Sequence, residues 1–258
     1  MKTTFQMLGA LLLLPLYASC SLFNKAPMEM VTYDHPNSST KERLIVFMRG
    51  MGGNHYSFEK EGLVADIFER HAPFDMVAPN AHFGYYADRS LIKRMKEDVI
   101  DPAHAQGYKE IWLIGFSMGG LGALLYTIDH PEDVQGIYLV APFLGYRSLL
   151  NEIATAGGVH HWEPGNFDPD KKWQRMLWRW LKQNVAEQPT KPIYLGYGEK
   201  DPYVDGQRLL AQVLPPDRVF TVPGGHDYES FKRLWDKFLD NGGFHPADAA
   251  ETDAQAQR

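Results

Sequence analysis

The sequence predicts one α/β domain with a mostly parallel central sheet and helices on both faces. Short apolar runs, of the kind that form strands buried on both faces, alternate along the chain with segments of helical periodicity. Strands that alternate with helices pair in parallel through right-handed crossovers. At 258 residues the chain is long enough for one large domain and too short for two.

The composition narrows the class of function. Hydrophobic residues make up 44% of the chain and charged residues 22%, as in ordinary folded proteins. The formal net charge of −6 and the lack of a run of five basic residues argue against a nucleic-acid partner. Neither H-E-x-x-H nor G-x-G-x-x-G occurs and no lysine follows a glycine, so we expect no metal, no cofactor and no phosphate-binding loop.

Residues 1–19 are typical of an export signal. Lys2 supplies positive charge, and the apolar segment 7–14 is too short to span a bilayer. The small residues before the only cysteine, Cys20, resemble a bacterial lipobox, which implies a lipid anchor on Cys20 in the outer membrane, on its periplasmic side. Ordinary cleavage near Ala18, giving a periplasmic or secreted protein, is the alternative. Residues 20–29 are expected to form a tether.

The first expected elements are two strands of different character. Met30–Tyr33 predicts an edge strand, whereas five consecutive apolar residues at 44–48 predict a strand buried on both faces. A helix is expected over 56–69 and a strand over 74–79. The aromatic loop 80–86 follows that strand, at the edge where open α/β sheets bind ligands.

The chain continues with a helix expected over 89–105 and an apolar strand over 111–114. Helical spacing follows in the next segment, at Leu121, Leu124, Leu125 and Ile128. Three more strands and a last helix complete the domain, which is expected to span 30–243 before a disordered tail at 244–258. The strands are predicted at 136–141, 192–198 and 218–223, and the last helix begins after Asp227 as its N-cap.

The interval 143–190 breaks this alternation. It is too long for a simple crossover, and Trp173, Met176, Leu177 and Trp180 recur on one helical stripe. Two interpretations are open. The segment is either a crossover helix packed on the sheet or a small lid whose underside forms part of a substrate pocket.

A serine stands where one predicted strand turns directly into a helix. The sequence Gly115-Phe116-Ser117-Met118-Gly119 follows the strand at 111–114 and has the spacing G-x-S-x-G. So tight a turn exposes the Ser117 hydroxyl, and it requires glycine two residues before and two after because a Cβ there would clash with neighbouring backbone.

A serine hydroxyl needs a base to activate it and an acid to orient that base. His226 follows the last predicted strand after two glycines, and Asp201 follows the strand before it, with Glu199 and Asp205 as rival acids. On these three motifs the chain resembles the α/β-hydrolases from about Leu44 to Leu239. The resemblance implies the α/β-hydrolase fold, with Ser117 as nucleophile, His226 as general base and acid, and Asp201 as the orienting carboxylate.

The resemblance also implies an oxyanion hole made of two backbone N–H groups. One should belong to Met118, directly after the nucleophile, and the other to Met51, in the loop after the strand at 44–48. Many α/β-hydrolases have His-Gly where this chain has Arg49-Gly50, a departure that leaves the N–H donor in place.

These motifs predict a serine hydrolase that cleaves a small-molecule carboxylic ester through an acyl-enzyme. A thioesterase, a peptidase or an acyltransferase with the same triad is the alternative within catalysis, and a non-catalytic envelope binding protein is the alternative outside it. Several aromatic residues lie near strand ends and fit either an apolar acyl site or the core. They are Phe83, Tyr85, Tyr86, Phe143 and Trp162. The sequence does not indicate an oligomeric state.

Overall fold

The computed structural model describes residues 24, 26–36 and 41–244. Seven strands form one sheet in the order β1-β3-β2-β4-β5-β6-β7, and all neighbours are parallel except β1, which is antiparallel to β3. The predicted α/β class with a mostly parallel sheet is therefore confirmed. The strands are β1 (Met30–Tyr33), β2 (Arg43–Met48), β3 (Asp75–Pro79), β4 (Glu110–Phe116), β5 (Gly136–Val140), β6 (Ile193–Gly198) and β7 (Val219–Val222).

Side chains alternate between the two faces of the sheet and build two separate cores. In β2, Leu44 and Val46 belong to one core, whereas Ile45 and Phe47 belong to the other, and all four are buried. Continuous apolar runs are therefore required, because both faces are covered by helices. The first core also takes in residues of α3 to α9, and the second those of α1, α2 and α10.

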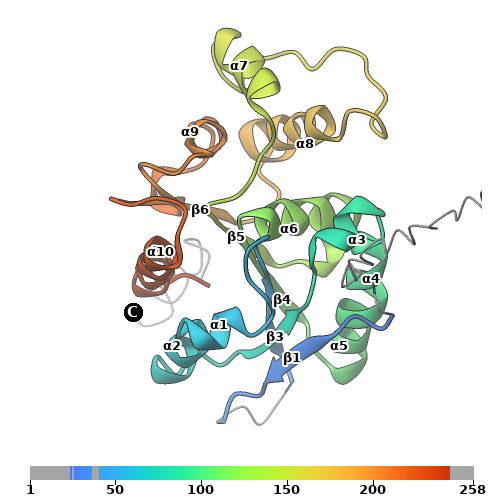
Figure 1. Ribbon diagram of the computed structural model, residues 1–258, viewed down its shortest axis with the longest axis vertical. Coiled ribbons are helices and arrows are strands. Elements are labelled where there is room, and N and C mark those ends of the chain that lie inside the picture. The colour runs from blue at the N-terminus through green and yellow to red at the C-terminus, as the bar shows by residue number, and fades with distance from the viewer. Residues whose placement is uncertain (1–23, 25, 37–40, 245–258) are drawn as a thin grey trace, which may run out of the picture.

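The helices lie on both sides of the sheet, as Figure 1 shows. Those packed on the second core are α1 (Ser57–Lys60), α2 (Leu63–Glu69) and α10 (Tyr228–Asp240). Those packed on the first are α3 (Phe83–Ala87), α4 (Leu91–Met95), α5 (Asp101–Gln106), α6 (Met118–Asp129), α7 (Arg147–Thr155), α8 (Trp173–Leu181) and α9 (Val204–Ala211). Loops that follow the parallel strands β2, β4, β6 and β7 all leave the same edge of the sheet.

Two predicted helices are interrupted. The helix expected over 56–69 is split into α1 and α2 because Gly62 takes a left-handed conformation, with φ of 82°. The helix expected over 89–105 widens into a π-helical turn at Lys96–Ile100 between α4 and α5. Pro102, the second residue of α5, has no N–H to donate to the preceding turn, which explains a local departure from α-helical bonding.

The interval 143–190 contains α7, α8 and a π-helical turn at Lys182–Glu187. Of the predicted stripe on α8, Leu177 is buried, and Trp173, Met176 and Trp180 are partly buried. The buried indole is that of Trp178, whose Nε1 donates a hydrogen bond to the carbonyl oxygen of Leu144 at 2.8 Å. A buried acceptor for Nε1–H makes this orientation favourable, and periodicity alone does not reveal it.

The expected signal peptide and the lipidation site at Cys20 lie outside the described residues, as does nearly all of the expected tail. Within the described part of the chain, no helix combines the length and the apolarity that a membrane crossing requires. The predicted N-cap of the last helix is confirmed, since the Asp227 carboxylate accepts a hydrogen bond from the Ser230 N–H at 2.8 Å.

Candidate active site

Ser117 occupies the sharp turn between β4 and α6 in a backbone conformation that L-residues rarely adopt. Its φ is 54° and its ψ is −115°. The surrounding backbone holds this turn: the Ser117 N–H donates to the Val140 carbonyl at 2.9 Å, and the Ser117 carbonyl accepts from the Phe143 N–H at 3.0 Å. Strained residues of this kind persist where neighbouring structure fixes them, and they are common at functional sites.

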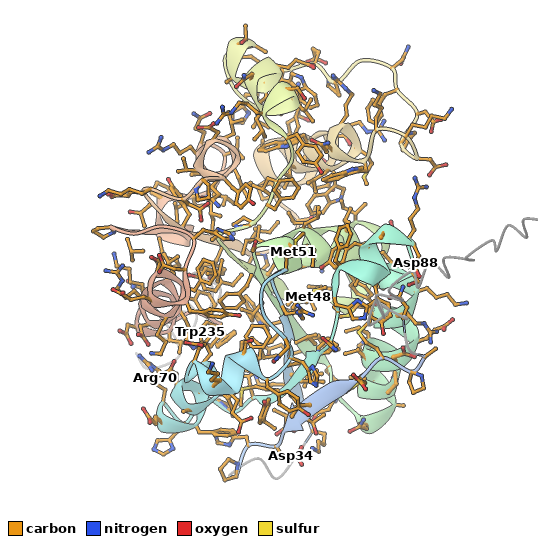
Figure 2. The ribbon with its side chains drawn as sticks, viewed as in Figure 1. Asp34, Met48, Met51, Arg70, Asp88 and Trp235 are labelled. Atoms are coloured by element: carbon orange, nitrogen blue, oxygen red, sulfur yellow. The ribbon has the colours of Figure 1, made fainter. Side chains whose placement is uncertain are left out.

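The two glycines that flank Ser117 are required by close backbone contacts. A Cβ at Gly115 would lie 2.5 Å from the carbonyl oxygen of Gly119, and a Cβ at Gly119 would overlap the carbonyl oxygen of Met48 at the end of β2. Figure 2 shows Met48 in the interior and Met51 farther along the same segment. Because both obstacles are backbone atoms, no side-chain movement can relieve them.

Three side chains from three strand ends form one chain of hydrogen bonds. His226 Nε2 lies 2.8 Å from Ser117 Oγ, and His226 Nδ1 lies 2.7 Å from Asp201 Oδ2. A carboxylate only accepts hydrogen bonds, so Nδ1 carries the proton and Nε2 is left to accept from the Ser117 hydroxyl. The structure thus brings the three predicted residues together in the order that activates a serine.

Asp201 is 2% exposed and uses both carboxylate oxygens. Oδ2 faces His226, while Oδ1 accepts a hydrogen bond from the Tyr203 N–H at 2.8 Å. The His226 ring packs edge-on against Tyr203 and Phe231, with centroids 5.0 and 5.1 Å away. These contacts fix the imidazole plane. Glu199, one of the rival acids, is exposed.

The two N–H groups expected to form the oxyanion hole lie on either side of the Ser117 turn. Met118 is the first residue of α6, where N–H groups have no intrahelical partner. In the described part of the chain, the backbone N–H of neither Met118 nor Met51 donates a hydrogen bond to another protein group. A Cβ on Gly50 would lie 3.3 Å from Ser117 Cβ, so the Met51 loop passes close to the nucleophile.

Arg49 fixes the shape of that loop. Its guanidinium donates to the carbonyl oxygens of Gly50 at 3.2 Å and Met51 at 3.0 Å, and to Asn80 Oδ1 at 3.1 Å. Arg49 is 9% exposed, burial lowers its pKa, and among the described residues it forms no ion pair with a carboxylate. Sequence reasoning noted the departure at Arg49 but missed this role, because the bonded carbonyls belong to the loop itself.

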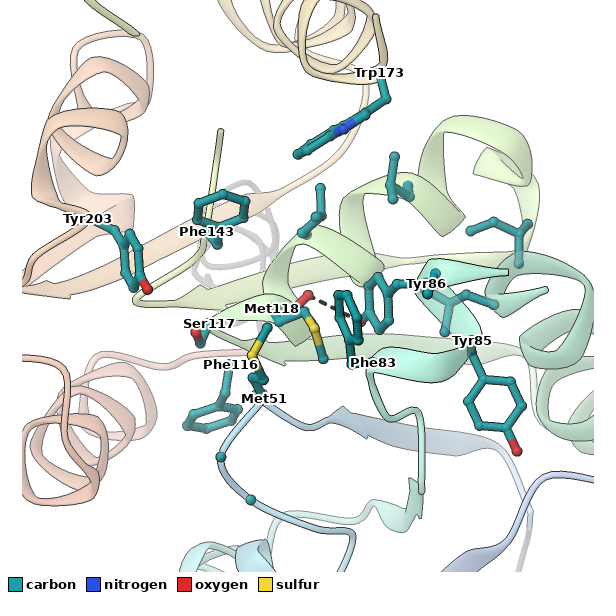
Figure 3. A pocket seen from close by; sticks show the side chains of 18 of the residues that line it. Met51, Phe83, Tyr85, Tyr86, Phe116, Ser117, Met118, Phe143, Trp173 and Tyr203 are labelled. Carbon is teal, nitrogen blue, oxygen red and sulfur yellow. Dashed lines mark hydrogen bonds between the residues drawn. The ribbon is translucent and has the colours of Figure 1, made fainter. Parts of the chain in front are cut away.

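A cavity of about 1100 Å³ opens above Ser117 (Figure 3). Tyr203 stands on one side of the serine and Phe83 and Tyr86 on the other, with Phe143 and Trp173 above. Its volume is that of a site for a sizeable organic molecule. The Tyr86 hydroxyl donates to the Met118 carbonyl at 3.1 Å, which links this wall to the start of α6.

Of the five aromatic residues that the sequence left open between an acyl site and the core, Phe83, Tyr86 and Phe143 line the cavity without being fully buried, whereas Trp162 and Tyr85 are buried. Trp162 does not line the cavity but is buried, with Nε1 donating to Glu152 at 2.8 Å, and Tyr85 lines it while being only 1% exposed. Leu121, Leu125 and Ile128 of α6, which the sequence showed only as residues at helical spacing, also line the cavity, and that spacing does not distinguish a cavity wall from core.

The only cluster of metal-ligand type among the described residues is His130, Glu132 and Asp133, which begins at the C-terminal end of α6, whereas Ser117 lies at its N-terminal end. Asp133 already accepts hydrogen bonds from Lys96 at 2.9 Å and Tyr126 at 2.7 Å. Although burial opposes it, these bonds hold the pKa of Asp133 below its usual value. Its oxygens are therefore occupied by protein donors, as in a structural ion-pair network.

Comparison with known proteins gives one family and a group of solved structures. The family model described as alpha/beta hydrolase fold matches residues 43–162. No curated protein sequence matches the chain at a significant level.

The chain is similar to fluorophosphonate-binding serine hydrolase F of Staphylococcus aureus, with a TM-score of 0.58 and 15% identity over 85% of this chain and 93% of that one. It is also similar to S-formylglutathione hydrolase of Staphylococcus aureus, with a TM-score of 0.55 and 15% identity over 83% and 97%. It is similar as well to Est1E from Butyrivibrio proteoclasticus, solved with ferulic acid bound, with a TM-score of 0.52 and 17% identity over 83% of this chain and 96% of that one.

Proposed function

Since the chain has the α/β-hydrolase fold, we propose that it is a serine hydrolase that cleaves carboxylic esters through an acyl-enzyme on Ser117. The observation that carries this proposal is the unbroken series of hydrogen bonds from Asp201 through His226 to Ser117 at the floor of a largely apolar cavity. Fold alone does not define an activity, so the proposal rests on this geometry.

In the first half of the reaction, Ser117 Oγ attacks the ester carbonyl carbon and its proton passes to His226 Nε2. The carbonyl oxygen becomes an oxyanion and accepts hydrogen bonds from the backbone N–H groups of Met51 and Met118. Asp201 stabilises the imidazolium through Nδ1–H. Nε2–H then protonates the leaving alkoxide, the ester C–O bond breaks, and the acyl group stays on Ser117.

In the second half, water attacks the acyl carbon while His226 Nε2 takes one of its protons. The second tetrahedral intermediate is held by the same two N–H groups. It collapses with return of the proton to Ser117 Oγ, and the carboxylic acid leaves. No other reactant is needed, because the alcohol and the acid account for all atoms of the ester and the water.

The named neighbours support a serine hydrolase and favour ester or thioester substrates. One is described as fluorophosphonate-binding, one as a hydrolase of S-formylglutathione, and others as esterases. A thioesterase with this triad is therefore the second candidate. Matched oxygen and sulfur esters of the same acyl group distinguish the two by their ratio of kcat/KM.

The decisive experiment compares Ser117→Ala with Ser148→Ala, whose serine is exposed and does not line the cavity. We expect Ser117→Ala to lower kcat on nitrophenyl butanoate by about 10⁴ to 10⁶ and to abolish labelling by a fluorophosphonate probe. Ser148→Ala should retain both. Wild-type protein that is folded but neither turns over esters nor reacts with the probe would point to a non-catalytic binding protein.

For the segment outside the described residues, we propose export followed by lipid attachment at Cys20. The spacing of the signal sequence and Ala18-Ser19-Cys20 supports this. Two or three acyl chains would give stable anchoring, whereas a single chain binds a bilayer only marginally. Mass spectrometry of the mature N-terminus should find acylated Cys20. An unmodified N-terminus near Ser19 would instead indicate a soluble exported protein.

A further inference from the structure

One face of α6 forms the floor of a long arm of the cavity. Met118, Leu121, Leu125 and Ile128 all line it, at helical spacings of three, four and three residues. Met118 is adjacent to Ser117, and Ile128 lies ten positions farther along the helix. At a rise of about 1.5 Å per residue the arm extends about 15 Å from the nucleophile.

The other walls of this arm are apolar over most of its length. They come from α3 and α4 on one side and from α8 above, and consist mainly of Phe83, Tyr86, Leu91, Ile92, Trp173 and Met176. Among the described residues, the charged side chains that line the cavity are Asp227 beside His226, and Arg89, Asp129 and Asp170 elsewhere. Asp129 directly follows Ile128 and so marks the far end of the arm, while Arg89 and Asp170 meet at another point of the wall. There the Arg89 guanidinium donates to the Asp170 carbonyl at 3.1 Å.

The rim of the cavity is apolar as well. Five large apolar side chains are exposed among the described residues, and four of them, Met51, Phe83, Tyr146 and Tyr203, line this cavity. Exposed apolar residues that gather in one place mark a binding site, whereas scattered ones need no explanation. A site of this kind favours a substrate with a large apolar part.

The position of His226 decides which part of an ester enters the long arm. His226 must protonate the leaving oxygen, so the alcohol lies on the His226 side of Ser117, where Tyr203 contacts the imidazole ring. The acyl group then points the other way. Figure 3 shows Phe83 and Tyr86 on the opposite side of Ser117 from Tyr203, and in Figure 1 α3 and α4 lie across α6 from α9 and α10.

We propose that the substrate is an ester of a straight-chain fatty acid, whose acyl chain lies along α6 between Ser117 and Ile128. An extended alkyl chain advances about 1.3 Å per carbon, given C–C bonds of about 1.5 Å, so an arm of about 15 Å holds about eleven or twelve carbons. A longer chain meets the charged Asp129 at the end of α6. This inference rests on the proposed function, because it takes Ser117 as the acylated atom.

The first test is the rate on nitrophenyl esters of increasing chain length, used below their aggregation limits. We expect kcat/KM to rise at least tenfold from four carbons to ten or twelve, since each buried methylene adds favourable transfer free energy. It should fall again beyond about fourteen carbons. A maximum at two to four carbons, with a steady decline afterwards, overturns the proposal while leaving the ester hydrolase intact.

The second test blocks the arm at three distances with Leu121→Trp, Leu125→Trp and Ile128→Trp. Three, seven and ten residues of helix correspond to about 4, 10 and 15 Å, so the longest chain accepted should be about four, eight and twelve carbons in turn. In Leu125→Trp, the ratio of kcat/KM for nitrophenyl dodecanoate to kcat/KM for nitrophenyl butanoate should fall at least tenfold. Leu239→Trp is the matched control, because Leu239 is also half-buried but lies on α10 outside the cavity.

A binding measurement separates the two proposals. Calorimetry on Ser117→Ala should show that dodecanoate binds at least tenfold more tightly than butanoate, and that Leu125→Trp in the same background removes the difference. If the wild type hydrolyses butanoate and reacts with a fluorophosphonate but no chain-length preference exists, only this inference fails. If dodecanoate binds but no ester is cleaved and no probe reacts, the proposed function fails instead.

Discussion

The two halves of the cavity are constructed from different parts of the chain. Around Ser117 and His226 the geometry is set by backbone: a positive φ, glycines against carbonyl oxygens, and short loops at strand ends. Along α6 the surface is made by side chains of helices, such as Leu125 and Ile128, that are partly exposed to the cavity. Backbone geometry tolerates few substitutions, whereas an apolar helix face tolerates many of similar volume.

Under the proposed function, this difference implies that the chemistry is fixed while the acyl preference is adjustable. Changes in the backbone-determined half should abolish activity or folding for every substrate. Changes in the helical half should alter the choice of substrate and leave the reaction itself in place.

The largest effect on chemistry, apart from removal of the nucleophile, is expected for Asp201→Asn. An amide in this place can donate to His226 Nδ1 and so favours the wrong tautomer, which lowers kcat by about 10⁴. Folding should persist because Asn retains an oxygen for the Tyr203 N–H. Circular dichroism together with kcat on a short ester tests both statements. If kcat of Asp201→Asn stays within tenfold of the wild-type value, another acid must orient His226.

Gly119→Ala should be the most damaging glycine substitution. The added methyl group overlaps the Met48 carbonyl oxygen, and a backbone obstacle of this kind costs about 4 kcal/mol or more in free energy of unfolding. Gly52→Ala is the control, because nothing lies within 4 Å of a Cβ there. Urea unfolding should place Gly52→Ala within about 0.5 kcal/mol of wild type. Equal stabilities for the two variants would refute the proposed contact.

Arg49→Met tests whether the guanidinium holds the Met51 loop in shape. Loss of its bonds to two loop carbonyls should displace one oxyanion donor and lower kcat by about 10- to 100-fold with little change in KM, less than complete loss of a donor. Asn80→Ala removes only one of the three bonds and should have a smaller effect. An equal loss for short and long acyl chains is expected, because both use the same oxyanion hole. A change confined to KM would contradict this role.

The smallest effect is expected in the α7 to α8 segment. Arg175 and Trp162 donate hydrogen bonds to Glu152, and they hold the pKa of that carboxyl below its usual value. Glu152→Gln should lower the free energy of unfolding by at most about 1 kcal/mol, since Glu152 is exposed to solvent. A depressed pKa stabilises the fold above the ordinary value of about 4.5, and this stabilisation is lost as the pH falls through the lowered pKa of Glu152, so the difference should shrink on acidification. A difference that does not shrink on acidification would show another cause.

The sequence predicted the backbone-determined half well. Ser117 is recognisable because only glycine fits at positions 115 and 119 of its turn. His226 is recognisable because it follows the last strand after two glycines. At both positions the backbone geometry requires particular residue types, so it can be read from the sequence. The strand positions were also predictable, because strands buried on both faces read as unbroken apolar runs.

The helical half was less predictable for a physical reason. A stripe such as Leu121, Leu125 and Ile128 has the same period whether it faces a packed core or an open cavity. Trp178 likewise gives no signal that its indole has an acceptor at Leu144. The break at Gly62 depends on a left-handed conformation that glycine permits but does not demand.

The Asp201 carboxylate has a consequence for anyone who wishes to redesign this protein. One of its oxygens lies against His226 Nδ1 and the other accepts from the Tyr203 N–H, and the Tyr203 ring lines the cavity beside His226. Under the proposed function, reshaping Tyr203 and its loop to admit bulkier alcohols should therefore also disturb the contact between Asp201 and His226. Laboratory evolution should extend the activity to esters of other acids through single substitutions. Activity on esters of other alcohols should instead require coordinated, compensating substitutions.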